Sequence, residues 1–497
     1  MSGLFGTLNT ATKGLHAQQN ALQTIGHNVA NANTVGYTRQ RVNMQADLAT
    51  SIPGIGQIGT GVRISGISRV NDEYITNQLR EGQAKTQTHE TLSDIIGQLE
   101  AVFNEPSDTG LSNQISEVFN AWTYLASNPE QDSARTMLVQ TSETFTDVIN
   151  HMANSMESLH KATVTELDKS ALDANSTLEQ LEQLNHQIWQ ASVRGFTPND
   201  LLDKQDQLLH DLSGQVDISV EKDKYNRVSV SVDNQMVLDS SSRKELAIVV
   251  GHNDEGQALF SNGDALDGDF EVGQLFVRTP GEDSNTYTQV DANQGSIKGT
   301  QLSLEVIENM QSELNEFASA FAKAVNTIHS DEGNGRDFFT LEPGNAASSI
   351  KVASELRENS SLVVSGRDMN NALSGDGSRA QAIASLQHKT LAADSAVWNY
   401  NSDDMTFDSS ATGSTLFGRY NSLVTEMGII KQQSDNMLDT QNGLMNLLTQ
   451  RRESISGVDI NEEVVDMIKY SSAFQANSRV LQTLSDMLDT LINRTGV

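Results

Sequence analysis

The sequence of 497 residues contains no cysteine. This absence excludes disulfide bonds, thiolate metal sites and a cysteine nucleophile, but both cytosolic and disulfide-free secreted proteins share it. Proline and aromatic residues are also scarce, at six prolines and 5% aromatics. This composition is typical of a helix-rich chain, and we expect no single large aromatic core.

Basic residues are few: the chain has 33 lysines and arginines but 65 aspartates and glutamates, which gives a formal net charge of −32. Nucleic-acid binding needs clustered Lys and Arg to contact phosphates, and no basic patch of useful length occurs. The acidity favours a solvated surface that keeps monomers apart before assembly. We therefore expect no nucleic-acid partner.

Long apolar runs are missing as well. None approaches the roughly 18 residues that a membrane-spanning helix needs, so no membrane insertion is expected. The N-terminus also lacks a charged region followed by a continuous apolar core, so we expect no cleavable signal peptide. A route out of the cell would have to retain the N-terminus.

Motifs for catalysis and cofactor binding are absent or incomplete. Gly54, Gly56 and Gly59 match the dinucleotide fingerprint, but an alternating strand follows them where a helix is required, which favours a glycine-rich turn. No HExxH, GxSxG or P-loop motif occurs. The acidic segment 331–337 lacks the ligand spacing of an EF-hand, so a solvated turn is favoured and calcium binding stays open. We expect no enzyme activity, no cofactor and no catalytic metal.

What the chain does have is a seven-residue apolar repeat at each end, which keeps one stripe of a helix facing a partner. Such stripes are usually ordinary core. These lie at the termini, where most chains fray, and paired only with each other they would leave apolar surface exposed. The assembly interface that we predict comprises Leu4, Leu8, Leu15, Leu22, Ile25, Val29, Ile460, Met467, Phe474, Leu481, Leu484, Leu488 and Leu491.

The charges of the two ends are complementary. Residues 1–46 contain Lys13, Arg39 and Arg41 and no acid, whereas 458–497 carry six acids and three bases. We expect the basic end to pair with the acidic one. Within the acidic end, Asp459 is predicted to cap the helix while Glu462, three residues later, completes a capping box.

Between the ends, apolar spacing predicts helices, and a two-residue alternation marks one β region. The fold class is therefore mainly α with an inserted antiparallel β domain, in a hairpin-like chain whose N- and C-terminal helices pair as a coiled coil. The predicted helices cover 4–32, 71–104, 111–127, 130–194, 201–212, 379–393 and 416–455, and helical spacing also recurs from Ile307 to Ile328. The predicted domains are a terminal coiled-coil domain of 1–35 and 458–497, a helical middle domain of 36–212 and 293–457 with a short extended segment, and an outer β domain of 213–292.

Two terminal strings, 27–39 and 474–483, resemble the shared signatures of the axial proteins of the bacterial flagellum, the rod, hook and hook-associated proteins. The signature positions are Asn28, Asn31, Asn33, Thr34, Gly36, Tyr37, Gln475 and Asn477. Internal strings narrow the resemblance to the hook-associated members at the hook–filament junction, and they lie at 74–80, 197–208 and 454–463. The resemblance is weak over 214–292 and 340–378, so no role of an outer domain is carried over.

The resemblance implies a structural adaptor that joins the flagellar hook to the filament. It implies an extracellular location after export through the flagellar type III channel without signal cleavage. The implied partners are further copies of the chain in a ring, the hook protein, the second junction protein (hook-associated protein 3), and an export chaperone at the C-terminal helix. Alternatives are another axial structural protein, such as the hook protein or the second junction protein, or a secreted enzyme with a coiled-coil anchor, whose catalytic motif is missing.

Overall fold

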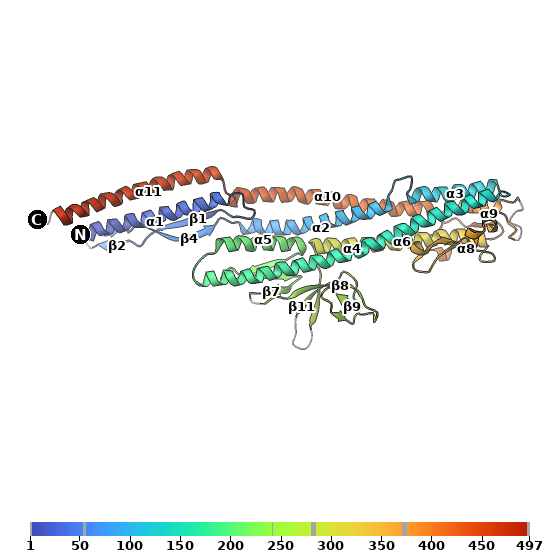
Figure 1. Ribbon diagram of the computed structural model, residues 1–497, viewed down its shortest axis with the longest axis horizontal. Helices are drawn as coiled ribbons and strands as arrows, with labels where there is room; N and C mark the ends of the chain where they lie inside the picture. The colour runs from blue at the N-terminus through green and yellow to red at the C-terminus, as the bar shows by residue number, and fades with distance from the viewer. Residues whose placement is uncertain (1, 53–55, 241, 280–284, 370–374, 495–497) are drawn as a thin grey trace.

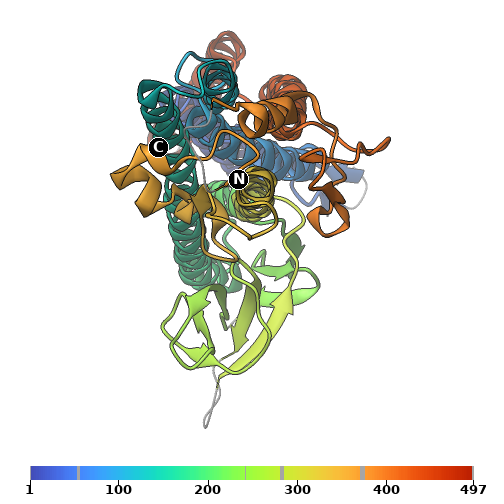
Figure 2. The same ribbon diagram turned by 90° about the vertical axis from the view of Figure 1, so that its right-hand side faces the viewer.

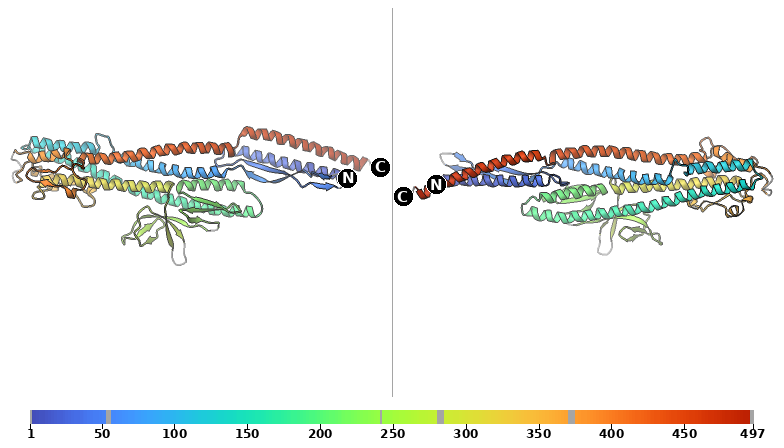
Figure 3. Two further views of the ribbon diagram at one scale, coloured as in Figure 1. Left: turned by 180° about the vertical axis from the view of Figure 1, so that it is seen from behind. Right: turned by 45° about the horizontal axis from the view of Figure 1, so that its top comes forward.

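The computed structural model describes residues 2–52, 56–240, 242–279, 285–369 and 375–494. The protein is an elongated rod with both termini at one end, as Figures 1 and 3 show. We call that end the terminal layer. Its members are α1 (Ser2–Ala30), α11 (Ile460–Asp489), β1 (Gln40–Ala46), β4 (Val62–Arg69) and the small hairpin β2 (Thr50–Ile52) and β3 (Gly56–Ile58).

The rest of the rod, which we call the body, consists of long helices packed side by side. The longest has 62 residues, about 93 Å at 1.5 Å per residue. These helices are α2 (Glu73–Phe103), α3 (Leu111–Ser127), α4 (Asp132–Val193), α5 (Asn199–Gln215), α6 (Ser296–Ser330) and α10 (Leu416–Ser456). The predicted fold class is confirmed, because the chain is mainly helical, carries inserted antiparallel sheets and packs its terminal helices together.

Short elements cover the end of the body that lies away from the termini. One of them, α9 (Ser378–Ser385), is shorter than the helix predicted over 379–393, because a 3-10 turn follows Ser385. These elements are β13 (Phe339–Thr340), α7 (Ala346–Ser349), β14 (Lys351–Val352), α8 (Ser354–Glu358), η1 (Ser360–Leu362), α9 (Ser378–Ser385), η2 (Leu386–His388), η3 (Ser395–Val397), β15 (Tyr400–Asn401) and β16 (Thr406–Phe407). Beyond α11, η4 (Thr490–Arg494) ends the described chain.

The β region projects from one side of the helices, as the end-on view in Figure 2 shows. Its three-stranded sheet has the order β5-β6-β7 and its five-stranded sheet β10-β9-β8-β11-β12, both antiparallel. The strands are β5 (Ser219–Lys222), β6 (Val228–Val232), β7 (Gln235–Leu238), β8 (Glu245–His252), β9 (Ala258–Phe260), β10 (Ala265–Leu266), β11 (Leu275–Thr279) and β12 (Thr286–Val290).

Two asparagines of α4 fasten this β region to the helices. The Asn185 side chain donates to the Val228 carbonyl (2.8 Å) and accepts from the Val228 amide (2.9 Å). Asn175 makes the same pair of bonds with Leu246, at 2.7 and 2.8 Å. Each side chain therefore bonds a strand residue as a neighbouring strand would, which satisfies backbone groups that the helix covers.

The apolar residues form three clusters. The largest fills the far half of the body and gathers many of the aromatic side chains, including Trp122, Phe145 and Phe321. The expectation of no large aromatic core is wrong, because a low average over the chain conceals local concentration. A second cluster joins α4 and α5 to the sheets, and a third lies within the five-stranded sheet. None of the described members of these clusters belongs to α1 or α11.

His329 is a titratable group inside the largest cluster. Its Nδ1 lies 2.8 Å from the Arg336 carbonyl, and its Nε2 accepts from the Val364 amide at 3.3 Å. The first bond requires a proton on Nδ1 and the second a bare Nε2, so the geometry holds a neutral ring. Burial lowers the pKa of His329 to about 4.

This histidine predicts a loss of stability in acid. Because its folded pKa lies below the ordinary value of 6.5, the stabilisation is present above pH 6.5 and is lost as pH falls toward 4. Between pH 7 and pH 5 the free energy of unfolding should drop by about 2 kcal/mol from this group. Calorimetry of the parent and of His329→Gln at both pH values measures the difference. An identical pH dependence in the two proteins would contradict the prediction.

Candidate assembly surfaces at the chain ends

The face of α1 that contacts α11 is lined by small residues. Ala11, Gly14, Ala17 and Ala21 are buried, and Ile25 continues the row. A Cβ built on Gly14 would lie 3.0 Å from Nδ2 of Asn477, so the two helices approach closely at this point. The contact surface therefore differs from the stripe of leucines that dominates the sequence pattern.

The predicted leucine stripe lies on the flank of that contact. At 100° per residue, the row of Leu8 and Leu15 is turned by about a quarter of a circle from the row of Gly14 and Ile25. Its members remain half-buried in the single chain, except for Ile25, which is buried. These half-buried members are Leu4, Leu8, Leu15, Leu22 and Val29.

On α11 only Glu463 and Leu484 are buried among the residues that the structure describes. The predicted Phe474, Leu481 and Leu488 are half-buried, and the predicted Ile460, Met467 and Leu491 are exposed. Apolar side chains outside the predicted repeat are exposed too, Val465 by 64% and Ile468 by 63%. This second apolar row lies outside the predicted heptad repeat. The adjacent valines at 464 and 465, which cannot share one stripe, were its signal in the sequence.

The signature residue Asn28 lies at the C-terminal end of the α1 face that contacts α11. Its amide nitrogen donates to the Gln40 carbonyl (2.9 Å) and to Oε2 of Glu463 (3.1 Å). Its oxygen accepts from the Gln40 amide (3.0 Å) and from the Tyr37 hydroxyl (2.8 Å). The side chain is 1% exposed, and these four bonds satisfy a buried amide completely.

Arg39 binds the first turn of α11. Its Nε lies 2.7 Å from Oε1 of Glu463, and its Nη1 lies 2.7 Å from Oε2 of Glu462. Burial alone would lower the pKa of Arg39, but the hydrogen bonds and negative charges of these two glutamates raise it. The Arg39 amide also donates to the Ser456 carbonyl at the end of α10 (2.9 Å). One residue thus holds the end of α10 and the start of α11.

Two of the charge predictions need correction. Asp459 caps α11 as predicted, accepting from the Asn461 amide at 2.8 Å. Glu462 does not complete a capping box, because its carboxylate is drawn to Arg39. Lys13 pairs with Asp47 at 2.6 Å and not with α11. The pairing of basic and acidic ends therefore rests on Arg39 alone among the three basic residues.

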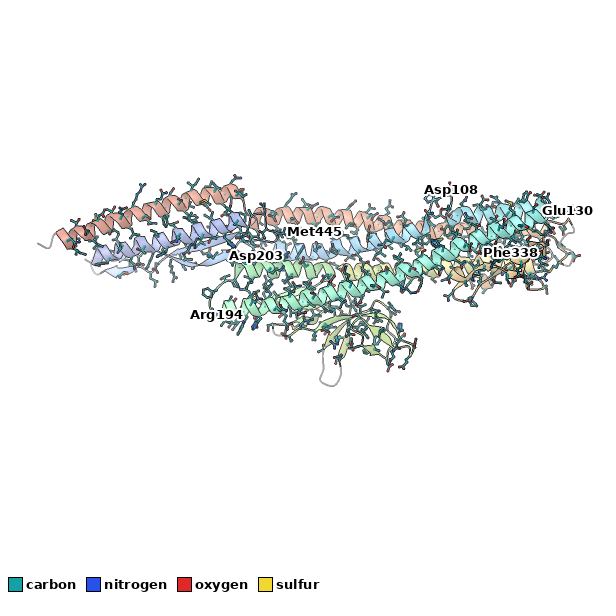
Figure 4. The ribbon with its side chains drawn as sticks, in the orientation of Figure 1. Asp108, Glu130, Arg194, Asp203, Phe338 and Met445 are labelled. Atoms are coloured by element: carbon teal, nitrogen blue, oxygen red, sulfur yellow. The ribbon has the colours of Figure 1, made fainter. Side chains whose placement is uncertain are left out.

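The same loop joins the body through α5. Asp203 accepts from the Thr38 amide (3.1 Å) and from Arg69 (2.8 Å), where the terminal layer meets the body (Figure 4). Burial raises the pKa of Asp203, and the bonds from Arg69 and Thr38 offset that shift only in part. Burial and the charges of Asp200 and Asp203 raise the pKa of Tyr37.

The remaining signature residues shape the turn before this loop. Asn31 donates to the His27 carbonyl (3.0 Å) and Thr34 to the Asn31 side chain (3.3 Å). Gly36 has φ +80°, in the left-handed region that favours glycine. Asn33 and Gln475 are exposed. The signature therefore combines a buried connector, Asn28, with turn residues and two solvent-facing amides.

The structure describes the acidic segment 331–337 but only part of the glycine-rich segment. Asp331 of the acidic segment accepts from the Tyr400 hydroxyl (3.1 Å) and lies 3.9 Å from Arg379. Within the described ranges, no three His, Cys, Asp or Glu side chains gather as a metal site would require. Gly54 of the glycine-rich segment lies outside the described residues. Likewise, none of the helices in the described part of the chain has the length and apolarity to cross a bilayer.

Comparisons with protein families match three parts of the chain. The family described as "Flagellar hook-associated protein FlgK helical domain" matches residues 96–339. The family "Flagella basal body rod protein" matches residues 8–38, and "Flagellar basal body rod FlgEFG protein C-terminal" matches 449–494. The two terminal matches overlap the signature strings at 27–39 and 474–483.

Curated relatives and one solved structure are similar over most of the chain. The flagellar hook-associated protein 1 of Bacillus subtilis is 29% identical over 100% of this chain and 99% of its own. The protein of the same name from Escherichia coli is 25% identical, over 98% and 99%. The hook junction protein FlgK of Burkholderia pseudomallei shares the fold, with a TM-score of 0.57 at 14% identity over 76% of this chain and 100% of that one.

Proposed function

The chain belongs to the flagellar hook-associated protein 1 family, whose members are structural proteins of the hook–filament junction, and we propose that its terminal layer is the part that assembles. The protein is an axial component of the flagellum. In this role it acts as an adaptor between hook and filament. The work is mechanical, and we propose that no catalysis accompanies it.

The observation that supports an assembling terminal layer is its exposed apolar surface. α11 leaves Val465 and Ile468 in solvent, and α1 and α11 contribute nothing to the described core clusters. Contiguous exposed apolar surface marks an interaction site. Covering it gains roughly 25 cal/mol per Å² of apolar area, which is partly offset by the ordering of the helices. That balance favours cooperative polymerisation of a soluble monomer.

In the proposed assembly, terminal layers of several copies pack as coiled coils around a central channel. The body spans from the hook on one side to the second junction protein on the other, and the β region faces solvent. We further propose export through the flagellar type III channel, with a chaperone covering α11 beforehand. The domain division of 1–35 with 458–497, 36–212 with 293–457, and 213–292 belongs to this proposal.

Electron microscopy of cells that lack this protein tests the adaptor role. We expect hooks without filaments and flagellin shed into the medium, both reversed when the full chain is supplied again. Cells that keep normal filaments without the protein would contradict the proposal.

A point substitution separates assembly from folding. Leu481→Asp places a charge on the half-buried side of α11, and we expect it to abolish filament attachment and weaken chaperone binding. Gln482→Asp adds the same charge at an exposed neighbouring position and is the matched control. The thermal transition of the body should stay unchanged in both variants. Titration calorimetry measures the affinity of each variant for the chaperone. Equal affinities in the two variants would count against chaperone binding at α11.

A further inference from the structure

The helices α1 and α11 run antiparallel, and two contacts define how their turns are matched. Near the middle of the pair, Gly14 faces Asn477, and at its inner end Asn28 bonds to Glu463. From Gly14 to Asn28 is 14 residues, and from Asn477 back to Glu463 is again 14 residues. Both contacts therefore belong to one register and lie two heptads apart.

Apolar packing alone does not select this register. Phe474, Leu481 and Leu488 recur every seven residues on α11, and apolar residues recur with the same period on α1. A slip of one heptad in either direction therefore restores most of the apolar contacts. Some feature that does not repeat must exclude the slipped pairings.

Glu463 is such a feature, because its side chain is only 2% exposed. In the observed register its carboxylate receives Nε–H of Arg39 and Nδ2–H of Asn28. A slip in one direction would place the carboxylate opposite Ala21, and a slip in the other would carry it past Ala30, where α1 ends. Either slip leaves the Asn28 amide without Glu463 and separates a buried carboxylate from its partners, which is strongly unfavourable.

Size complementarity adds a second constraint along the same row. The observed register brings the large Tyr470 opposite Ala21 and the amide of Asn477 against Gly14. One slip would place the larger Tyr470 at Gly14, where the smaller Asn477 side chain already lies 3.0 Å from the position of an added Cβ. The opposite slip would place Tyr470 against Asn28, whose four hydrogen bonds leave no room for a ring.

We propose that Asn28, Arg39 and Glu463 form a register key, which determines the turn of α11 that meets each turn of α1. Gly14 and Asn477 support it sterically. A single buried polar group is the best-attested device for fixing the register of paired helices. Arg39 also bonds to Ser456, so the key sets the register relative to the end of α10. The inference concerns the chain's own helix pair and does not rest on the proposed role at the junction.

Because the chain has no cysteine, engineered disulfides report the register directly. In the full-length protein, Ala21→Cys with Tyr470→Cys traps the observed register. Thr7→Cys with Asn477→Cys and Ala21→Cys with Asn477→Cys trap the two slipped registers. Each pair is oxidised in the parent chain and in chains carrying Glu463→Leu or Glu462→Leu, and the linked peptides are quantified by mass spectrometry.

We expect Glu463→Leu to raise the fraction of slipped links about tenfold or more over the parent. Glu462→Leu removes the exposed partner of Arg39 and should leave the fraction unchanged. An equal slipped fraction in the parent and in Glu463→Leu overturns the proposal. So does a parent chain in which the pair Ala21→Cys with Tyr470→Cys fails to form its disulfide link.

Discussion

Removal of residues 2–30 is expected to reduce filament attachment to background while the body stays folded. The helix that is removed supplies one face of the terminal layer, so α11 would lose its packing partner and the bond from Asn28 to its buried carboxylate, whereas Arg39 is retained. None of the described core clusters loses a member. The midpoint of the body's thermal unfolding should therefore shift by less than about 2 °C, the equivalent of under about 1 kcal/mol.

The measurement combines filament counts by electron microscopy with calorimetry of the purified chain. A chain that keeps its length but carries a scrambled, non-repeating sequence over residues 2–30 is the control for chain length. Normal filament attachment by either chain would refute the assembly role of the terminal layer. A large drop in the melting temperature of the body would show that the two parts are energetically inseparable.

Gly295→Ala is expected to be among the most destabilising single substitutions in the body. Gly295 precedes α6 with φ +99°, and its amide donates to Oγ1 of Thr88 at 2.7 Å. An added Cβ would lie 2.5 Å from the Gln215 carbonyl oxygen, which is backbone and cannot rotate away. Backbone strain of order 1–3 kcal/mol adds to the clash, so we expect a total loss of about 3 kcal/mol or more.

A matched control for this substitution exists in the β region. Gly256 has φ +80°, and nothing lies within 4 Å of the Cβ that would be added there. Gly256→Ala therefore introduces the left-handed strain without the collision, and should cost about 1 kcal/mol. Urea unfolding curves of the two variants compare the two costs. Equal losses would show that the collision at Gln215 relaxes freely.

The long periodic elements were predictable because one physical rule dominates each of them. The 62-residue helix α4 keeps its 3–4 spacing over its whole length, and β6 alternates apolar and polar residues. The position of the β region between helical segments followed from the change of period. Tertiary contacts change little in such elements, so the sequence pattern alone is enough to predict them.

The contact surface of the terminal helices was less predictable. Leucine rows dominate a heptad analysis, yet close approach of two helices selects small residues such as Gly14 and Ala21. The partner of a charge was also uncertain, because Lys13 has Asp47 nearby only once the β1–β4 hairpin has folded against α1. Local rules favoured Glu462 as a cap, and a residue more than 400 positions away, Arg39, outcompeted the cap.

The packing of α10 along α2 has a consequence for the order of folding. Around Gly82 these helices lie so close that an added Cβ would be 2.6 Å from Sδ of Met445, which Figure 4 labels on α10. Once they are packed, the two chain ends leave the body side by side. The entropic cost of closing a loop of several hundred residues is then already met by the packing of the body. The folded body thereby holds α1 and α11 near each other at a high effective concentration. Terminal pairing then becomes the last and most reversible step of folding.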